Sequence, residues 1–161
     1  MSETTTPSTT PTATLPPELE VLRRRRAEMG ESMAAVEQAL TAPAPGRVAA
    51  WAERVHAALV ELSADLRVHV EVTEAPDGLF AQVVASSPRL SGAVSRLDRE
   101  HTHLLPAVET LVSDAERVAD LVGVEALREG CADLLRSLAR HRQAGADLVY
   151  EAYVVDIGGE T

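Results

Sequence analysis

The sequence predicts an all-α fold, an antiparallel up-down-up-down four-helix bundle, from its composition, its hydrophobic periodicity and its turn signals. Aromatic residues make up only 2% of the 161 residues, and β-branched residues other than valine are rare after the first residues, so strand-forming side chains are scarce. Apolar residues recur at alternating steps of four and three, which places them along one side of a helix. We call each such line of residues a seam, and prolines and glycines separate the seams.

The first seam runs from Leu15 to Leu40, and Arg26 is its only member that is not apolar. Its helix is expected to end before Pro43, because the segment 42–46 combines two prolines and a glycine.

The second seam runs from Val48 to Thr73, and the turn residues 76–78 follow it. The apolar segment from Leu79 to Ala85 has the length of a strand, but no partner strand is predicted. A helical or irregular connection is therefore expected there.

The third seam begins after Ser87-Pro88, a typical helix start, and runs from Leu90 to Val122. Pro106 removes one backbone hydrogen bond within it and is expected to kink the helix. Gly123 is the expected break before the last helix.

The fourth seam runs from Val124 to Ala152. Because most connections are short, consecutive helices are expected to be antiparallel neighbours. The bundle is expected to span residues 15–155, with a disordered Thr/Pro-rich tail at 1–14 and a C-terminal tail at 156–161.

Charge, cysteine content and sequence motifs limit the possible functions and the location of the protein. A net charge of −10 and the absence of a basic stripe with aromatics argue against nucleic-acid binding. The single cysteine, Cys131, excludes an intramolecular disulfide, and no signal peptide or membrane span is recognised, so a cytoplasmic location is expected. No Gly-rich phosphate loop or nucleophile elbow is present, and an enzyme is not expected.

Each seam contains one large polar residue, and three of the four are histidines. Burying a histidine costs about 1 to 3 kcal/mol unless its nitrogens find partners, so three inward histidines on separate helices require an explanation. Two interpretations remain open: hydrogen-bonded core histidines, or a metal site, for which imidazole suits Zn, Fe, Cu and Ni. The polar seam residues are Arg26, His69, His101 and His141.

The expected helix lengths partly fix where these residues meet. Folding the last two helices back on each other brings His141 within one turn of His101. The level of His69 is not fixed in this way, because a long connection follows it. Arg26 falls opposite about Glu61, on the order of 12 Å from the level of His69.

These features resemble the hemerythrin-like (HHE) cation-binding domain. His69 lies late in the second helix, Glu100-His101 lies early in the third, and His141 in the fourth helix is followed by acidic residues. The resemblance extends from about Pro17 to Tyr153. It implies a four-helix bundle with a non-haem di-iron centre that binds oxygen, senses oxygen or iron, or stores metal.

The sequence departs from the family pattern at several ligand positions. The first helix contains no histidine, and Arg26 takes a comparable place; Thr73 and Gly145 stand where carboxylates are expected. The first hypothesis is therefore a metal-binding or sensing protein with an incomplete site, in which one metal ion is easier to accommodate than two irons. Its candidate ligands are His69, Glu74, His101, His141 and Asp147.

Two alternatives accompany this hypothesis. The first is a metal-free structural or interaction module, with no protein partner indicated, in which Arg26 replaces a ligand and pairs with Glu74, Glu100 or Asp147. The second is a histidine phosphotransfer bundle, for which the off-seam His56 is the only sensible candidate in a chain without lysine.

Overall fold

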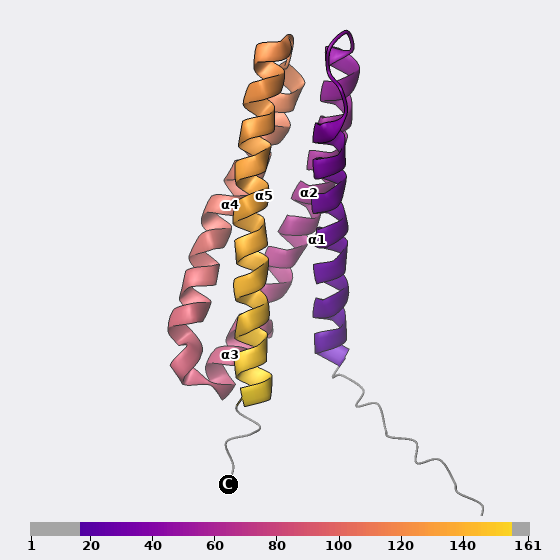
Figure 1. The fold of residues 1–161 in the computed structure, drawn as a ribbon. Helices are drawn as coiled ribbons and strands as arrows, with labels where there is room; N and C mark the ends of the chain where they lie inside the picture. Colours follow the sequence, from indigo (N-terminus) through magenta and orange to yellow (C-terminus); the bar gives the residue numbers. More distant parts are fainter. Residues whose placement is uncertain (1–16, 156–161) are drawn as a thin grey trace, which may run out of the picture.

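The computed structural model describes residues 17–155, and its four long helices pack as an antiparallel up-down bundle (Figure 1). α1 packs against α2, α2 against α4 and α4 against α5, while contacts between α1 and α5 close the ring. The predicted all-α bundle is thus confirmed, and the predicted tails at 1–14 and 156–161 lie outside the described residues. The long helices are α1 (Pro17–Thr41), α2 (Val48–Glu74), α4 (Ser91–Arg117) and α5 (Leu121–Tyr150).

The connection between α1 and α2 is the tight turn predicted from its prolines and glycine. Gly46 adopts a positive φ of 74°, a conformation that side chains with a Cβ rarely take. The guanidinium of Arg128 on α5 donates hydrogen bonds to the carbonyl oxygens of Leu40 and Ala42, at 3.1 Å each. These bonds satisfy carbonyl groups at the end of α1 and tie it to α5.

The connection between α2 and α4 contains the short helix α3 (Leu79–Ser86) and a 3₁₀ turn, η1 (Pro88–Leu90). Of the two forms expected for this segment, helical or irregular, the structure shows the helical one. Gly78 begins it, and a Cβ at this position would lie 2.4 Å from the carbonyl oxygen of Val72, so the backbone fits only glycine. In Figure 1, α3 lies at the lower end of the bundle.

The break between the last two helices lies earlier than predicted. α4 continues through Pro106 and ends at Arg117, and α5 begins at Leu121, so Gly123 lies inside α5 rather than between the helices. The cause is Asp120, whose carboxylate accepts a hydrogen bond from the Gly123 backbone N–H and caps α5. Val122, assigned to the third seam, is consequently 79% exposed. After α5 a π-helical turn covers Glu151–Val155.

Two hydrophobic clusters fill the bundle. The main core occupies the half nearest the α1–α2 and α4–α5 turns and includes Trp51, Leu59, Leu62, Leu66, Leu104, Val108, Leu127 and Leu138. The lower core lies beside α3 and consists of Leu79, Phe80, Val83, Leu90, Val94, Leu97, Leu148 and Ala152.

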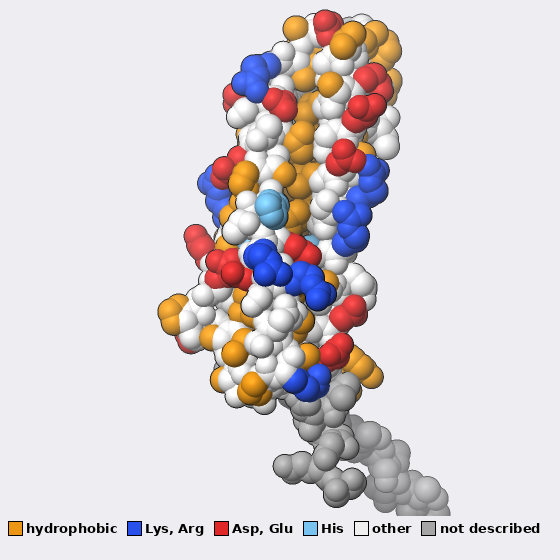
Figure 2. Space-filling view, turned by 90° about the vertical axis from the view of Figure 1, so that its left-hand side faces the viewer, with side chains coloured by type: hydrophobic (Ala, Val, Ile, Leu, Met, Phe, Trp, Pro, Cys, Tyr) orange, Lys and Arg blue, Asp and Glu red, His pale blue; other side chains and the backbone are white. Residues whose placement is uncertain are grey.

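The surface carries charges of both signs. Figure 2 shows one face, on which acidic and basic side chains are interspersed and hydrophobic side chains form a stripe between two helices. None of the described helices is both long and apolar enough to cross a membrane.

Candidate metal centre

Two of the seam histidines are fully enclosed at the boundary between the two cores. His101 is 1% exposed and His141 is 3% exposed. On α4, His101 lies between Leu97 of the lower core and Leu104 of the main core. The same spacing that places leucines in the core therefore places these imidazoles there.

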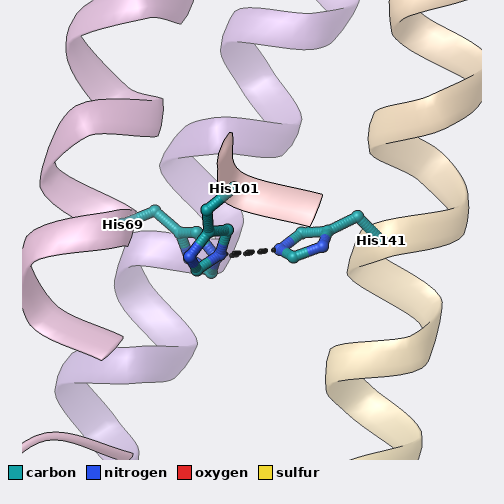
Figure 3. A group of neighbouring side chains, drawn as sticks. All are labelled: His69, His101 and His141. Atoms are coloured by element: carbon teal, nitrogen blue, oxygen red, sulfur yellow. Dashed lines mark hydrogen bonds between the residues drawn. The ribbon is translucent and has the colours of Figure 1, made fainter. Parts of the chain in front are cut away.

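The three histidines meet at one point, each from a different helix (Figure 3). The Nε2 atom of His141 lies 3.1 Å from Nε2 of His101 and 3.2 Å from Nε2 of His69. The three ligand nitrogens all lie within 4.8 Å of one another. The predicted meeting of His101 and His141 is confirmed, and His69, whose level the sequence left open, joins them.

Two carboxylates fix the orientation of two of the rings. Nδ1 of His101 donates to Glu74 Oε1 at 2.6 Å, and Nδ1 of His141 donates to Glu100 Oε2 at 2.6 Å. A carboxylate only accepts, so each of these Nδ1 atoms carries the ring proton. When both rings are neutral, neither Nε2 atom carries a proton, and the two lone pairs face each other across 3.1 Å.

Burial keeps two of the three rings, those of His69 and His141, uncharged. The pKa of His69 is lowered to about 3, chiefly by burial and then by the neighbouring His101 and His141. The pKa of His141 is also lowered by burial, although its hydrogen bond to Glu100 acts in the opposite direction. Both rings are therefore neutral at pH 7, the form in which imidazole binds metal ions.

The spacing of the nitrogens suits a single metal ion. Tetrahedral coordination with metal–nitrogen bonds of about 2.0 to 2.1 Å separates ligand nitrogens by about 3.3 Å. The separations of 3.1 and 3.2 Å between His141 and the other two histidines agree with this value. A carboxylate on the second ring nitrogen is also the usual partner of a metal-bound histidine.

The other predicted ligands occupy different places. Glu74 contacts the far side of His101, so it orients a ligand rather than facing the three Nε2 atoms. Asp147 is exposed and accepts a hydrogen bond from Gln143, and it does not reach the cluster. Thr73 is buried, but its hydroxyl donates to the carbonyl oxygen of His69 in its own helix.

Arg26 lies near the cluster but does not form the predicted ion pair. Glu74 and Glu100 are taken by histidines, and Arg26 instead donates to the carbonyl oxygen of Arg142 at 2.7 Å. Arg142 donates in return to the carbonyl oxygen of Arg26 at 3.1 Å, so the two side chains brace α1 against α5. Both positive charges contribute to the lowered pKa of His69.

The sequence did not indicate the roles of three residues near the cluster: Glu100 was named there, but not as a partner of His141. Arg142 and Glu100 each lie one residue from a seam histidine, a position from which a side chain points toward the neighbouring helix. The ring of Phe80 on α3 stacks on His101 with the centroids 5.6 Å apart. The adjacency of Glu100 and Arg142 to seam histidines was the available signal.

His56, the candidate for phosphotransfer, lies elsewhere on the bundle. Its Nε2 atom is 3.1 Å from Glu116 Oε1. A carboxylate at this distance opposes the approach of a phosphoryl group, since both carry negative charge.

Comparison with protein-family models, curated protein sequences and solved structures found no match for this chain. The description of the bundle and its triad of histidines therefore rests on the structure alone.

Proposed function

We propose that this protein binds one divalent transition-metal ion through the Nε2 atoms of His69, His101 and His141. The observation that carries the proposal is the close approach of the Nε2 atoms of His101 and His141, 3.1 Å apart, with both Nδ1 atoms paired with carboxylates. A metal ion between the two rings would bind both Nε2 atoms in place of their direct contact.

A mononuclear site is favoured over the di-iron centre of the hemerythrin-like family. Di-iron centres require carboxylates that bridge the metals, and the nearest ones, Glu74 and Glu100, bind the outer nitrogens of the histidines. The guanidinium groups of Arg26 and Arg142 add positive charge, which opposes a second cation. We therefore propose a bundle that resembles the hemerythrin-like domain but has a reduced ligand set.

Three protein ligands leave coordination positions open for a small molecule, as sensing or exchange of the metal requires. Zinc and iron(II) both accept imidazole, so the ligand set does not choose between them. We propose a metal-binding or metal-sensing role and assign no reaction.

The test is the metal content of the purified protein, followed by titration of the metal-free protein with Zn²⁺ and Fe²⁺ under anaerobic conditions. We expect one equivalent per chain, and a visible spectrum in air distinguishes iron from zinc. His101→Ala is expected to abolish tight binding. His103→Ala is the matched control, because His103 lies on the same helix and is exposed.

No stoichiometric metal after reconstitution would overturn the proposal. The protein would then be the metal-free interaction module, with Arg26 and Arg142 as the cations beside the histidines. Two irons per chain would contradict the mononuclear site.

A further inference from the structure

A cavity of about 310 Å³ lies in the lower half of the bundle, beside the histidines. Its walls come from α1, α2, α3, α4 and α5, and most of them are apolar, including Leu19, Leu22, Leu79 and Leu148. The lining also includes Arg23 and Arg25, which are exposed, so the cavity reaches the surface.

The charge of the lining is opposite to that of the molecule. The chain has a net charge of −10, yet the cavity is lined by Arg23, Arg25, Arg26 and Arg142 and by no aspartate or glutamate among the described residues. Arg25 is paired with Glu28 at 3.1 Å, so the positive charge that attracts anions to this apolar space comes chiefly from Arg23, Arg26 and Arg142.

Two of these arginines have no acidic partner within the described part of the chain. Arg26 and Arg142 are half-buried, and their oxygen partners are each other's backbone carbonyls. The Nε atom of Arg142 is buried and makes no hydrogen bond. Burial lowers the pKa of Arg142, with Arg26 adding to the effect, so the pair lacks the anion that would normally compensate it.

We propose that this cavity binds a small monocarboxylate with an apolar body, with its carboxylate at Arg26 and Arg142. Guanidinium groups match carboxylates in geometry as well as in charge. A volume of 310 Å³ corresponds to roughly ten water volumes of about 30 Å³, and hence to a molecule of roughly ten non-hydrogen atoms. A medium-chain fatty acid has this size and this combination of groups.

The inference goes beyond metal binding and does not require it. His69 and His141 also line the cavity, so a bound carboxylate would lie next to the metal centre. The arginines that hold it belong to α1 and α5 and are present whether or not a metal is bound.

The experiment is calorimetric titration of the full chain with octanoate, in the metal-free form and in the metal-loaded form. Octanol tests whether binding requires the charge, and acetate tests whether it requires the apolar body. Octylamine, which is positively charged at pH 7, tests whether the charge must be negative. We expect octanoate to bind in both forms, at least about tenfold more tightly than any of the other three, because charge-assisted hydrogen bonds strengthen its binding.

Gly145 provides a variant that fills the cavity without disturbing the helices. It lines the cavity, and a Cβ added there would meet no atom within 4 Å. Gly145→Leu is therefore expected to fold normally and to lose octanoate binding. Gly92→Leu is the matched control, because Gly92 is also helical, is equally unobstructed and lies outside the cavity.

Arg142→Gln tests the anion-binding group, with helical content and unfolding measured alongside. We expect octanoate affinity to fall by at least about tenfold while octanol binding is unchanged. Octanoate binding that survives Gly145→Leu, that requires the metal, or that octanol matches would overturn the proposal. Octanoate binding by a protein that takes up no metal would leave this inference standing while the proposed metal function fails.

Discussion

The two halves of the bundle are built from the same seams but differ in what fills them. In the main core, Leu59, Leu62 and Leu66 on α2 are completely buried among other apolar side chains. One turn below Leu66 the same seam reaches His69, and below it lies the cavity that Arg26 and Arg142 line with two further arginines. The interior of the upper half thus consists of apolar side chains, whereas the middle and lower parts also contain imidazoles and guanidinium groups.

The difference indicates that the main core stabilises the molecule, whereas the middle and lower parts provide the candidate binding sites. Burial of apolar surface stabilises by roughly 25 cal/mol per Å², so the main core can support polar groups elsewhere that reduce stability. Substitutions in the main core should therefore reduce stability, whereas substitutions around the histidines should reduce metal binding.

Leu59→Ala should produce the largest loss of stability. The side chain is 0% exposed, and its truncation leaves a cavity in the main core, so we expect the free energy of unfolding to fall by about 2 to 5 kcal/mol. Urea unfolding of the metal-free protein measures this. Val60→Ala is the matched control, because Val60 is the next residue and is 43% exposed. Equal losses in the two variants would mean that the main core is not the principal source of stability.

Glu100→Gln should weaken the metal centre while leaving the main core intact. The neutral amide holds the Nδ1 proton of His141 less firmly than the carboxylate does, so the metal affinity should fall by about 10- to 100-fold. Titration with Zn²⁺ measures the change. Glu109→Gln is the control, since Glu109 lies on the same helix and pairs with the exposed Arg67. An unchanged affinity would show that Glu100 does not orient the ligand.

Acid should destabilise the metal-free protein through His69. Its pKa is about 3 in the folded state against 6.5 in the unfolded state, so between these values only the unfolded chain gains the proton. Stability should fall as the pH is lowered through this window, by no more than about 1.4 kcal/mol per pH unit from this group. Urea unfolding from pH 6.5 to 4.5 should show a shallower dependence for His69→Gln. Parallel profiles would contradict the buried, neutral state of His69.

The sequence was sufficient to predict the fold because the seams are long and regular. Leucine and valine at steps of four and three define four helical faces, and short turns dictate their antiparallel order. The predicted position of the last turn was wrong because Gly123 was taken to interrupt the helix. The side chain of Asp120 caps α5 there, and Gly123 is accommodated in its first turn.

The candidate site was only partly predictable, for geometric reasons. His101 and His141 are joined by two helices and a short turn, so their meeting follows from counting residues. His69 is separated from them by α3 and η1, whose path depends on tertiary packing. To predict the contacts of Glu100 and Arg142, one must know how each helix is rotated about its axis. A seam does not specify this rotation closely enough.

His141→Leu offers the sharpest test, because it extends the main core into the site. The variant should no longer bind metal tightly, since one of the three nitrogens is lost. The metal-free variant should nevertheless be more stable than the metal-free parent, by about 1 kcal/mol, because a leucine replaces a buried polar ring and removes the facing lone pair. Glu100, which is 37% exposed, remains solvated when its partner is removed.

Urea unfolding of both proteins in the presence of a chelator decides between function and structure for this residue. A gain in stability means that His141 lowers the stability of the parent protein, as is expected of a residue whose role is to bind metal. A loss of more than about 1 kcal/mol, the usual contribution of one hydrogen bond, would instead make His141 a structural residue that bonds Glu100. The histidine at the boundary between the two halves would then serve to hold the helices together, and the proposal of a metal centre would lose its main support.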